Sequence, residues 1–231
     1  MKKYIVFIVL MCAGYHAQSQ VLISLLFGDK LNSPGLEFGL EGGANFSQIS
    51  GMESSNRMPS FNLGFYFDIR INDPWYIHTG LLVKSKLGTN KLSAADLEFL
   101  EVDVFGAEGD YNQELNYFIV PILAKYKLKN NIYFEAGPQL GLLTKSWVEF
   151  NSDVEGEDAR IRQYNRDMVN RLDAGATAGM GYQLLKGKGM TLGIKYYQGF
   201  VNVYKERSGT KNSSLFLMVN IPIGAAKVDS K

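Results

Sequence analysis

Apolar residues alternate with small or polar residues along most of this chain, and this period of two restricts the fold more than any other feature. Successive side chains of a β-strand point to opposite faces, so the alternation predicts strands with one apolar face and one polar face. In the first such segment, one face carries Leu36, Phe38, Leu40, Ala44 and Phe46, and the other carries Glu37, Gly39, Glu41, Gly43 and Asn45. Seven more segments repeat the pattern, at about 61–71, 75–86, 115–128, 132–145, 172–185, 190–203 and 213–224.

The lengths of these segments and of their connections favour one architecture. The segments have roughly 11–14 residues, which suits a membrane-crossing strand of about 9–11 residues better than the usual strand of about 5–6. Short connections at 72–74, 129–131 and 186–189 alternate with long ones at 47–60, 87–114, 146–171 and 204–212. We therefore predict an all-β fold, an eight-stranded antiparallel transmembrane β-barrel with short periplasmic turns and four longer extracellular loops.

Composition and charge are compatible with this fold and exclude others. The net charge of +1 leaves no basic field that would attract nucleic acid. The mean hydropathy of −0.09 is near neutral, as expected of a barrel that faces lipid with every second residue. Beyond residue 20 no apolar stretch is long enough for a membrane-spanning helix. Aromatic residues near the strand ends predict two interfacial girdles, with Trp75, Tyr126, Phe134 and Tyr182 beside the short turns and Phe46, Phe61, Trp147 and Tyr204 beside the long loops.

The N-terminus has the order of features of a secretory signal peptide. Lys2 and Lys3 precede an apolar run, and the small residues Ala17 and Ser19 follow at the two positions that a signal peptidase reads, so we expect residues 1–19 to be removed. Residues 20–35 then form an N-terminal periplasmic segment, 36–224 the barrel and 225–231 a C-terminal tail. Cys12 leaves with the signal peptide, so neither disulfides nor thiolate metal sites are expected in the mature chain.

Glycines indicate which face of the barrel points inward. They gather on the polar face, and glycine weakens a strand unless space is tight, as it is inside an eight-stranded barrel. Buried charges must be paired. We therefore predict a lumen plugged by ion pairs, with negligible conductance, among Glu37, Glu41, Asp68, Arg70, Lys84, Lys125, Glu135, Asp173 and Lys195.

Four segments resemble the PorT-like outer-membrane β-barrel family of Bacteroidota. They are 26–43, beginning Leu26-Phe27-Gly28-Asp29, then 117–126 with its Val120-Pro121-Ile122 core, 135–141, and 173–182. The resemblance implies an outer-membrane barrel and, for some members, a link to protein secretion. Unlike many outer-membrane barrels, this chain does not end on an aromatic residue. Pro121 cannot donate to a ladder, which predicts a bulge or a local opening there.

Few residues offer chemistry. His78 is the one histidine outside the signal peptide, and its place on the polar face predicts an interior hydrogen bond rather than catalysis. We expect no enzyme activity and no cofactor. One long loop is acidic and, by the preference of hard ions for oxygen ligands, is a possible divalent-cation site or a bridge to lipopolysaccharide. Its carboxylates are Asp96, Glu98, Glu101, Asp103, Glu108 and Asp110.

In the loop after 145, Ile161, Tyr164 and Met168 have helical spacing and predict a short helix. The expected role is structural, or that of an accessory subunit, with outer-membrane lipid, lipopolysaccharide and possible outer-membrane or periplasmic proteins as partners. Three alternatives remain: a small-pore or ligand-transporting barrel, a membrane-embedded hydrolase or acyltransferase, and a soluble periplasmic lipid-binding barrel.

Overall fold

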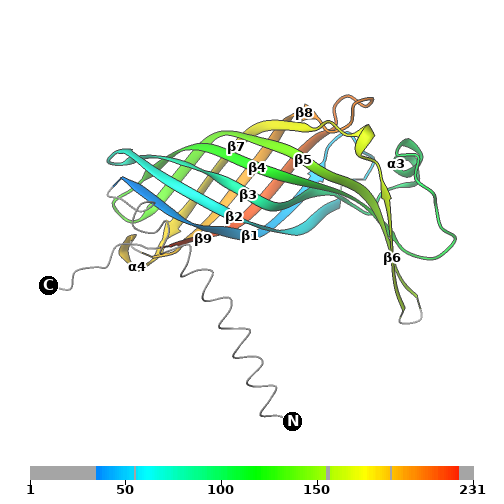
Figure 1. Ribbon diagram of the computed structural model, residues 1–231, viewed down its shortest axis with the longest axis horizontal. Helices are drawn as coiled ribbons and strands as arrows, with labels where there is room; N and C mark the ends of the chain where they lie inside the picture. Colours follow the sequence, from blue (N-terminus) through cyan, green and yellow to red (C-terminus); the bar gives the residue numbers. More distant parts are fainter. Residues whose placement is uncertain (1–34, 55, 155–156, 188, 224–231) are drawn as a thin grey trace, which may run out of the picture.

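The computed structural model describes residues 35–54, 56–154, 157–187 and 189–223, which form a closed antiparallel β-barrel (Figure 1). The expected signal peptide, the segment 20–34 and the tail 225–231 lie outside these residues. The strands are β1 (Leu36–Ile49), β2 (Asn56–Asn72), β3 (Trp75–Asn90), β4 (Asp110–Lys127), β5 (Ile132–Val154), β6 (Glu157–Tyr164), β7 (Leu172–Gln183), β8 (Thr191–Asn202) and β9 (Lys211–Pro222). The helices are α3 (Ala94–Phe99), α4 (Leu184–Gly187) and a 3-10 turn at Arg166–Met168. None of the helices in these ranges is long and apolar enough to cross a membrane.

Eight of the strands close the ring. Each pairs with its neighbours in the order β4-β3-β2-β1-β9-β8-β7-β5, and β4 pairs with β5 to close it. The first strand of the chain, β1, pairs with the last, β9, in register from Gly39↔Pro222 to Ile49↔Asn212. Strand β6 pairs only with the end of β5 and lies outside the ring. The predicted eight-stranded antiparallel barrel is therefore confirmed, with one additional strand.

Several strands extend further into the long loops than their sequence pattern predicts. Strand β5 continues to Val154, and its last eight residues pair with β6 in a hairpin that projects away from the barrel in Figure 1. The helix predicted around Ile161 and Tyr164 is therefore wrong, because these residues pair with Phe150 and Trp147 of the neighbouring strand. Hydrogen bonding along an existing strand outweighs a weak helical spacing.

The outer face of the barrel is apolar. Exposed large apolar side chains line it on every strand of the ring except β1, including Phe61, Leu63, Ile122, Leu140, Met180, Leu192 and Leu217. At the short-turn end, Trp75, Phe134 and Tyr182 are exposed as predicted for a girdle. The prediction fails for Tyr204 and Trp147 at the long-loop end. Tyr204 is fully buried among interior side chains, and Trp147 is covered by Arg162 at 4.8 Å and by Lys86 at 5.8 Å from its ring centroid.

The inward glycines make room mainly for tyrosine rings rather than for long charged chains. A Cβ at Gly39 would lie 2.5 Å from Cε1 of Tyr66, and one at Gly193 would lie 2.5 Å from the hydroxyl oxygen of Tyr133. A Cβ at Gly175 would lie 2.7 Å from Cε2 of Tyr197. The narrow lumen of an eight-stranded barrel leaves no room for a side chain on both sides of such a pair.

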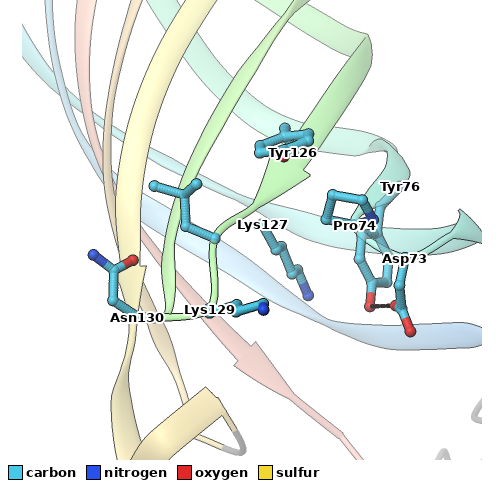
Figure 2. A pocket seen from close by; sticks show the side chains of 8 residues that line it. Asp73, Pro74, Tyr76, Tyr126, Lys127, Lys129 and Asn130 are labelled. Atoms are coloured by element: carbon cyan, nitrogen blue, oxygen red, sulfur yellow. Dashed lines mark hydrogen bonds between the residues drawn. The ribbon is translucent and has the colours of Figure 1, made fainter.

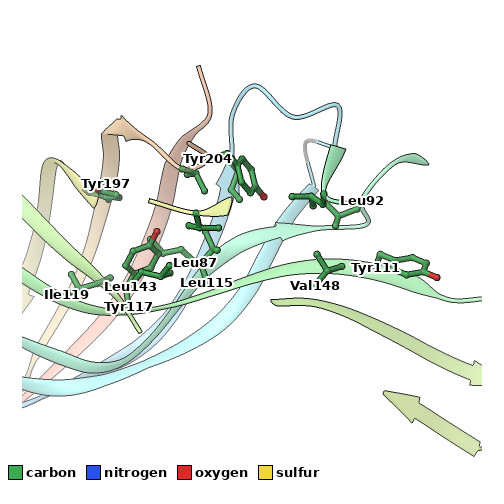
Figure 3. Close-up of a cluster of buried hydrophobic side chains, with 14 of the residues drawn as sticks. Leu87, Leu92, Tyr111, Leu115, Tyr117, Ile119, Leu143, Val148, Tyr197 and Tyr204 are labelled. Carbon is green, nitrogen blue, oxygen red and sulfur yellow. The ribbon is translucent and has the colours of Figure 1, made fainter. Parts of the chain in front are cut away.

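The half of the lumen beside the long loops holds a cluster of apolar and aromatic side chains next to hydrogen-bonded polar ones such as Gln113, Ser146 and Asn165, which differs from the uniformly polar interior that alternation predicts. Leu115, Tyr117, Ile119 and Leu143 are at most 2% exposed, and Tyr204 covers them from the loop above (Figure 3). Leu97 and Leu100, from α3 and the residue after it, join the same cluster. This packing closes the lumen at the extracellular end.

Two bulges change the alternation on one side of the barrel. The register between β3 and β4 shifts between Leu82 and Ser85, and the register between β4 and β5 shifts between Asn116 and Tyr117. No register shift occurs at Pro121, so no bulge forms there, but the ladder with β3 skips this residue between Thr79↔Ile122 and Leu82↔Ile119, which is the predicted local opening.

Candidate functional site

The polar half of the lumen holds a network of buried charges near the short-turn ends of the strands. Each member comes from a different strand, and all are at most 6% exposed. They are Glu41 on β1, Asp68 on β2, His78 on β3, Lys125 on β4, Glu135 on β5 and Lys195 on β8. All six side chains lie on the strand face that was predicted to point inward. The register between neighbouring strands is unbroken at this level, so no bulge turns any of them outward.

Two ammonium groups hold the carboxylates. The amine of Lys195 lies 2.8 Å from Oε1 of Glu41 and 3.1 Å from Oε1 of Glu135. The amine of Lys125 lies 2.7 Å from Oδ2 of Asp68 and stands over the ring of Tyr133, 4.3 Å from its centroid. The network therefore crosses the whole lumen, from β1 and β2 to β5 and β8.

His78 connects the two ion pairs. Its Nδ1 lies 2.7 Å from Oδ1 of Asp68, and its Nε2 lies 3.2 Å from the amine of Lys195. An ammonium only donates, so Nε2 must accept and the proton of a neutral ring must lie on Nδ1, donating to Asp68. Tyr66 stacks on the ring at 5.7 Å between centroids. This interior hydrogen-bonding role is the one predicted from the sequence.

Three buried carboxylates, Glu41, Asp68 and Glu135, face two buried amines and the ring of His78, whose Nε2 also lies 3.7 Å from Oε1 of Glu41. The third cation is Lys127, whose amine lies 3.6 Å from Oδ2 of Asp68 and whose side chain is 21% exposed. Charges removed from water are tolerated when they are paired, and Lys127 adds a third lysine charge beside these carboxylates. The interior set predicted from the sequence did not include Lys127. Its position two residues further along the same face is the signal that could have identified it.

The other predicted interior charges lie elsewhere. Glu37 is half-buried at the short-turn mouth and accepts a hydrogen bond from Tyr66 at 2.8 Å. Arg70 is exposed at the same end and pairs with Asp73. Asp173 is buried but lies apart from the lysines, accepting a hydrogen bond of 2.9 Å from Asn212. Lys84 contradicts the prediction, because the bulge after Leu82 places it on the outer surface.

Residues 17–205 match the family described as outer membrane protein beta-barrel domain. The chain belongs to this family. Solved structures similar to it include Ail, the attachment invasion locus protein of Yersinia pestis, at 10% identity, covering 81% of this chain and 99% of that one with a TM-score of 0.45. Neisserial surface protein A is similar at 12% identity, with coverages of 81% and 98% and a TM-score of 0.42. OprG from Pseudomonas aeruginosa is similar at 12% identity, with coverages of 81% and 93% and a TM-score of 0.36. No curated protein matches the chain.

In this outer membrane protein beta-barrel the extracellular loops are held together by Asp96, a residue that sequence analysis assigned to a cation site. Its carboxylate accepts hydrogen bonds from the hydroxyl and backbone N–H of Ser54, at 2.6 and 2.8 Å, and from the backbone N–H of Glu53 at 3.1 Å. Arg207, from a third loop, lies 3.5 Å away. Burial alone would raise the pKa of Asp96, but the hydrogen bonds from Ser54 and Glu53 outweigh it and hold the pKa below its ordinary value.

The acidic loop does not assemble a metal site. Across the part of the chain that the structure describes, no three histidine, cysteine, aspartate or glutamate side chains are grouped to hold a metal ion. Asp96 faces Ser54, and Asp110 lies 3.5 Å from the amine of Lys91. The loop forms helix α3 instead, capped at its start by the Ser93 hydroxyl, which accepts from the backbone N–H of Asp96.

A hollow of about 820 Å³ lies at the periplasmic end, between the turns that join β2 to β3 and β4 to β5 (Figure 2). Tyr76 lines it, and its hydroxyl donates a hydrogen bond of 3.4 Å to Oδ1 of Asp73. The amine of Lys127 lies 4.3 Å from the centroid of the Tyr76 ring. A smaller recess of about 220 Å³ at the lumen mouth ends at Asp68 and Lys127. The network is therefore the inner limit of the periplasmic mouth.

Proposed function

We propose that the chain is a non-enzymatic integral outer-membrane protein with a closed lumen, acting as a structural or accessory subunit of an outer-membrane assembly. The observation that carries this proposal is the double closure of the lumen. Paired charges from six strands fill the periplasmic half, and the cluster around Leu115 and Tyr204 fills the extracellular half. A barrel closed at both levels leaves its loops and its outer wall as the surfaces for recognition.

A non-enzymatic role is supported by the environment of His78. Both ring nitrogens are engaged, with Asp68 and with Lys195, and the ring is 0% exposed. A general base needs a reacting proton within hydrogen-bond reach, and neither partner supplies a nucleophile for it to activate. The arrangement therefore suits a fixed connector between two ion pairs better than a catalyst.

We further propose that the chain is a PorT-like barrel of Bacteroidota, secreted across the inner membrane by a cleaved signal peptide. The segments at 26–43, 117–126, 135–141 and 173–182 support the resemblance, and the order of residues in 1–19 supports the cleavage. A role near a secretion assembly follows from this resemblance. Affinity purification from native outer membranes tests it by identifying a stoichiometric partner, and N-terminal sequencing of the purified chain tests cleavage after Ser19.

Planar bilayer recording tests the closed lumen. The purified, folded protein is expected to give no current steps above the bare bilayer, because no continuous water path passes the two plugs. A variant with Tyr117→Ala and Lys195→Ala, which removes bulk at both levels, serves as the conducting control once its folded state is verified by gel mobility. Reproducible steps from the unaltered protein would favour the small-pore alternative. Recovery of the protein in the periplasmic extract would favour the soluble alternative.

A further inference from the structure

The apolar belt of the outer wall ends abruptly on strands β2 to β5. Its last exposed side chains toward the loops are Phe61 on β2, Val83 on β3, Phe118 on β4 and Leu142 on β5. The next outward residues on β3 and β5 are lysines. Lys86, Asn116 and Lys145 stand opposite one another in a single row across β3, β4 and β5. The row therefore lies at the level where the lipid-facing surface meets the extracellular side.

A bulge brings another lysine to this boundary. The register shift between Leu82 and Ser85 leaves both Val83 and Lys84 exposed on the outside, although the alternation assigns Lys84 to the lumen. Bulges commonly re-aim a side chain in this way. Beside it, the pairing of β2 with β3 stops between Leu63↔Lys84 and Arg57↔Thr89. The gap in the ladder opens a hollow in the wall.

The hollow combines polar and apolar surface. It has a volume of about 310 Å³, and its lining includes Lys84, Lys86, Ser60 and the exposed ring of Phe61. Because Phe61 also belongs to the apolar belt, the hollow is continuous with the lipid-facing surface. It can therefore take a ligand that has an anionic head and a hydrocarbon tail.

The charges around the hollow are unbalanced. Within the described ranges, Lys84 and Lys145 make no ion pair, whereas Lys86 pairs with Glu114 at 2.6 Å. Arg57, exposed at the upper end of the gap, donates to the backbone carbonyl of Phe46 and pairs with no carboxylate among the residues that the structure describes. Lys84, Lys86 and Glu114 line the hollow, and among the described residues the cations at this level outnumber the two acids, Glu114 and Glu149, so an anion there would restore the balance.

We propose that this surface, defined by Arg57, Lys84, Lys86 and Lys145, binds a phosphate group of an outer-leaflet glycolipid, the phosphorylated glucosamine head of lipid A. Lipid phosphates lie just above the hydrocarbon region, which is the level of the lysine row, and basic side chains near a membrane surface attract anionic headgroups. The acyl chains would lie along Phe61 and the belt below it. The inference rests on the outer-membrane location of the family and not on the closed lumen, so the two proposals fail independently.

The test uses the full mature chain in phosphatidylcholine nanodiscs containing a small fraction of lipid A. Native mass spectrometry after release from the disc measures how much lipid A stays bound. We compare bisphosphorylated with dephosphorylated lipid A, and the unaltered protein with K84Q and with K84Q/K145Q. K129Q, in the exposed periplasmic turn at the opposite end, is the matched control. Lys86 is left in place because its loss would strand Glu114.

We expect retention of the bisphosphorylated lipid to fall about fivefold for each lysine removed, and K129Q to behave as the unaltered protein. Raising the salt from about 50 to about 500 mM should weaken retention in the unaltered protein, because exposed charges are screened. Equal retention of the dephosphorylated lipid, or by K84Q/K145Q, would overturn the proposal. So would full competition by inorganic phosphate at millimolar concentration, which would indicate a site for the free anion.

Discussion

Lys195 is the residue whose removal tests the ion-pair network most directly. Its amine lies 2.8 Å from Glu41 and 3.1 Å from Glu135. With an effective dielectric constant of about 20, these two attractions amount to roughly 6 and roughly 5 kcal/mol. Removing the buried ammonium also removes its desolvation cost of several kcal/mol, so K195M should lose about 3–5 kcal/mol of unfolding free energy.

Urea titration of the protein in lipid vesicles, followed by tryptophan fluorescence, measures this loss. K129M, the same change at an exposed turn residue, should stay within about 0.5 kcal/mol of the unaltered protein. The triple variant K195M/E41Q/E135Q removes the stranded carboxylates and should recover most of the loss, because the cost arises from uncompensated buried charge. A K195M protein as stable as the K129M control, or a triple variant no more stable than K195M, would refute the reasoning.

Three further predictions concern other levels of the barrel. G193A should destabilise it by about 1–3 kcal/mol in the same titration, and Y133F should rescue it, because the added Cβ meets the Tyr133 hydroxyl oxygen at 2.5 Å but the next ring atom only at 3.7 Å. Lack of rescue would contradict this account. The lowered pKa of Asp96 means that its stabilisation of the loops is present above the pKa of the unfolded chain, near 3.9, and is lost as pH falls through the lower folded pKa. D96A should abolish this acid step and speed hydrogen exchange at Ser54 at neutral pH, whereas unchanged exchange would count against the contact. Calorimetric titration with Ca²⁺ should give no heat from the acidic loop, and a saturable signal would show that its carboxylates gather.

The charged lumen shows how far residue order predicts a site. The alternation assigns Glu41, Asp68, Lys125, Glu135 and Lys195 to one face, and the structure buries all of them. Which amine meets which carboxylate depends on the stagger between strands far apart in sequence, such as the 154 residues that separate Glu41 from Lys195. The alternation of side chains along one strand does not determine that stagger.

The exceptions have local physical causes. The bulge after Leu82 adds a residue to β3 and turns Lys84 outward, and no composition signal marks it. Asp173 also lies on the inward face of its strand, but the strand register places its carboxylate beside Asn212 rather than beside a lysine. Asp96 lies in an acidic run that suggested a cation site, whereas its partners come from loops more than 40 residues before it and more than 100 residues after it.

By itself, the sequence determined the eight barrel strands, their two faces and the alternation of short and long connections, because side-chain parity and strand length are local properties. Only the tertiary structure decided how the lumen is filled, with tyrosine rings against glycines, an upper half that combines an apolar cluster with buried amides, and a charged lower half. It also decided that the chain after Val154 returns as a strand and that one lysine faces the lipid boundary. These features depend on ring closure and strand register, which bring together residues whose order along the chain carries no record of their contact.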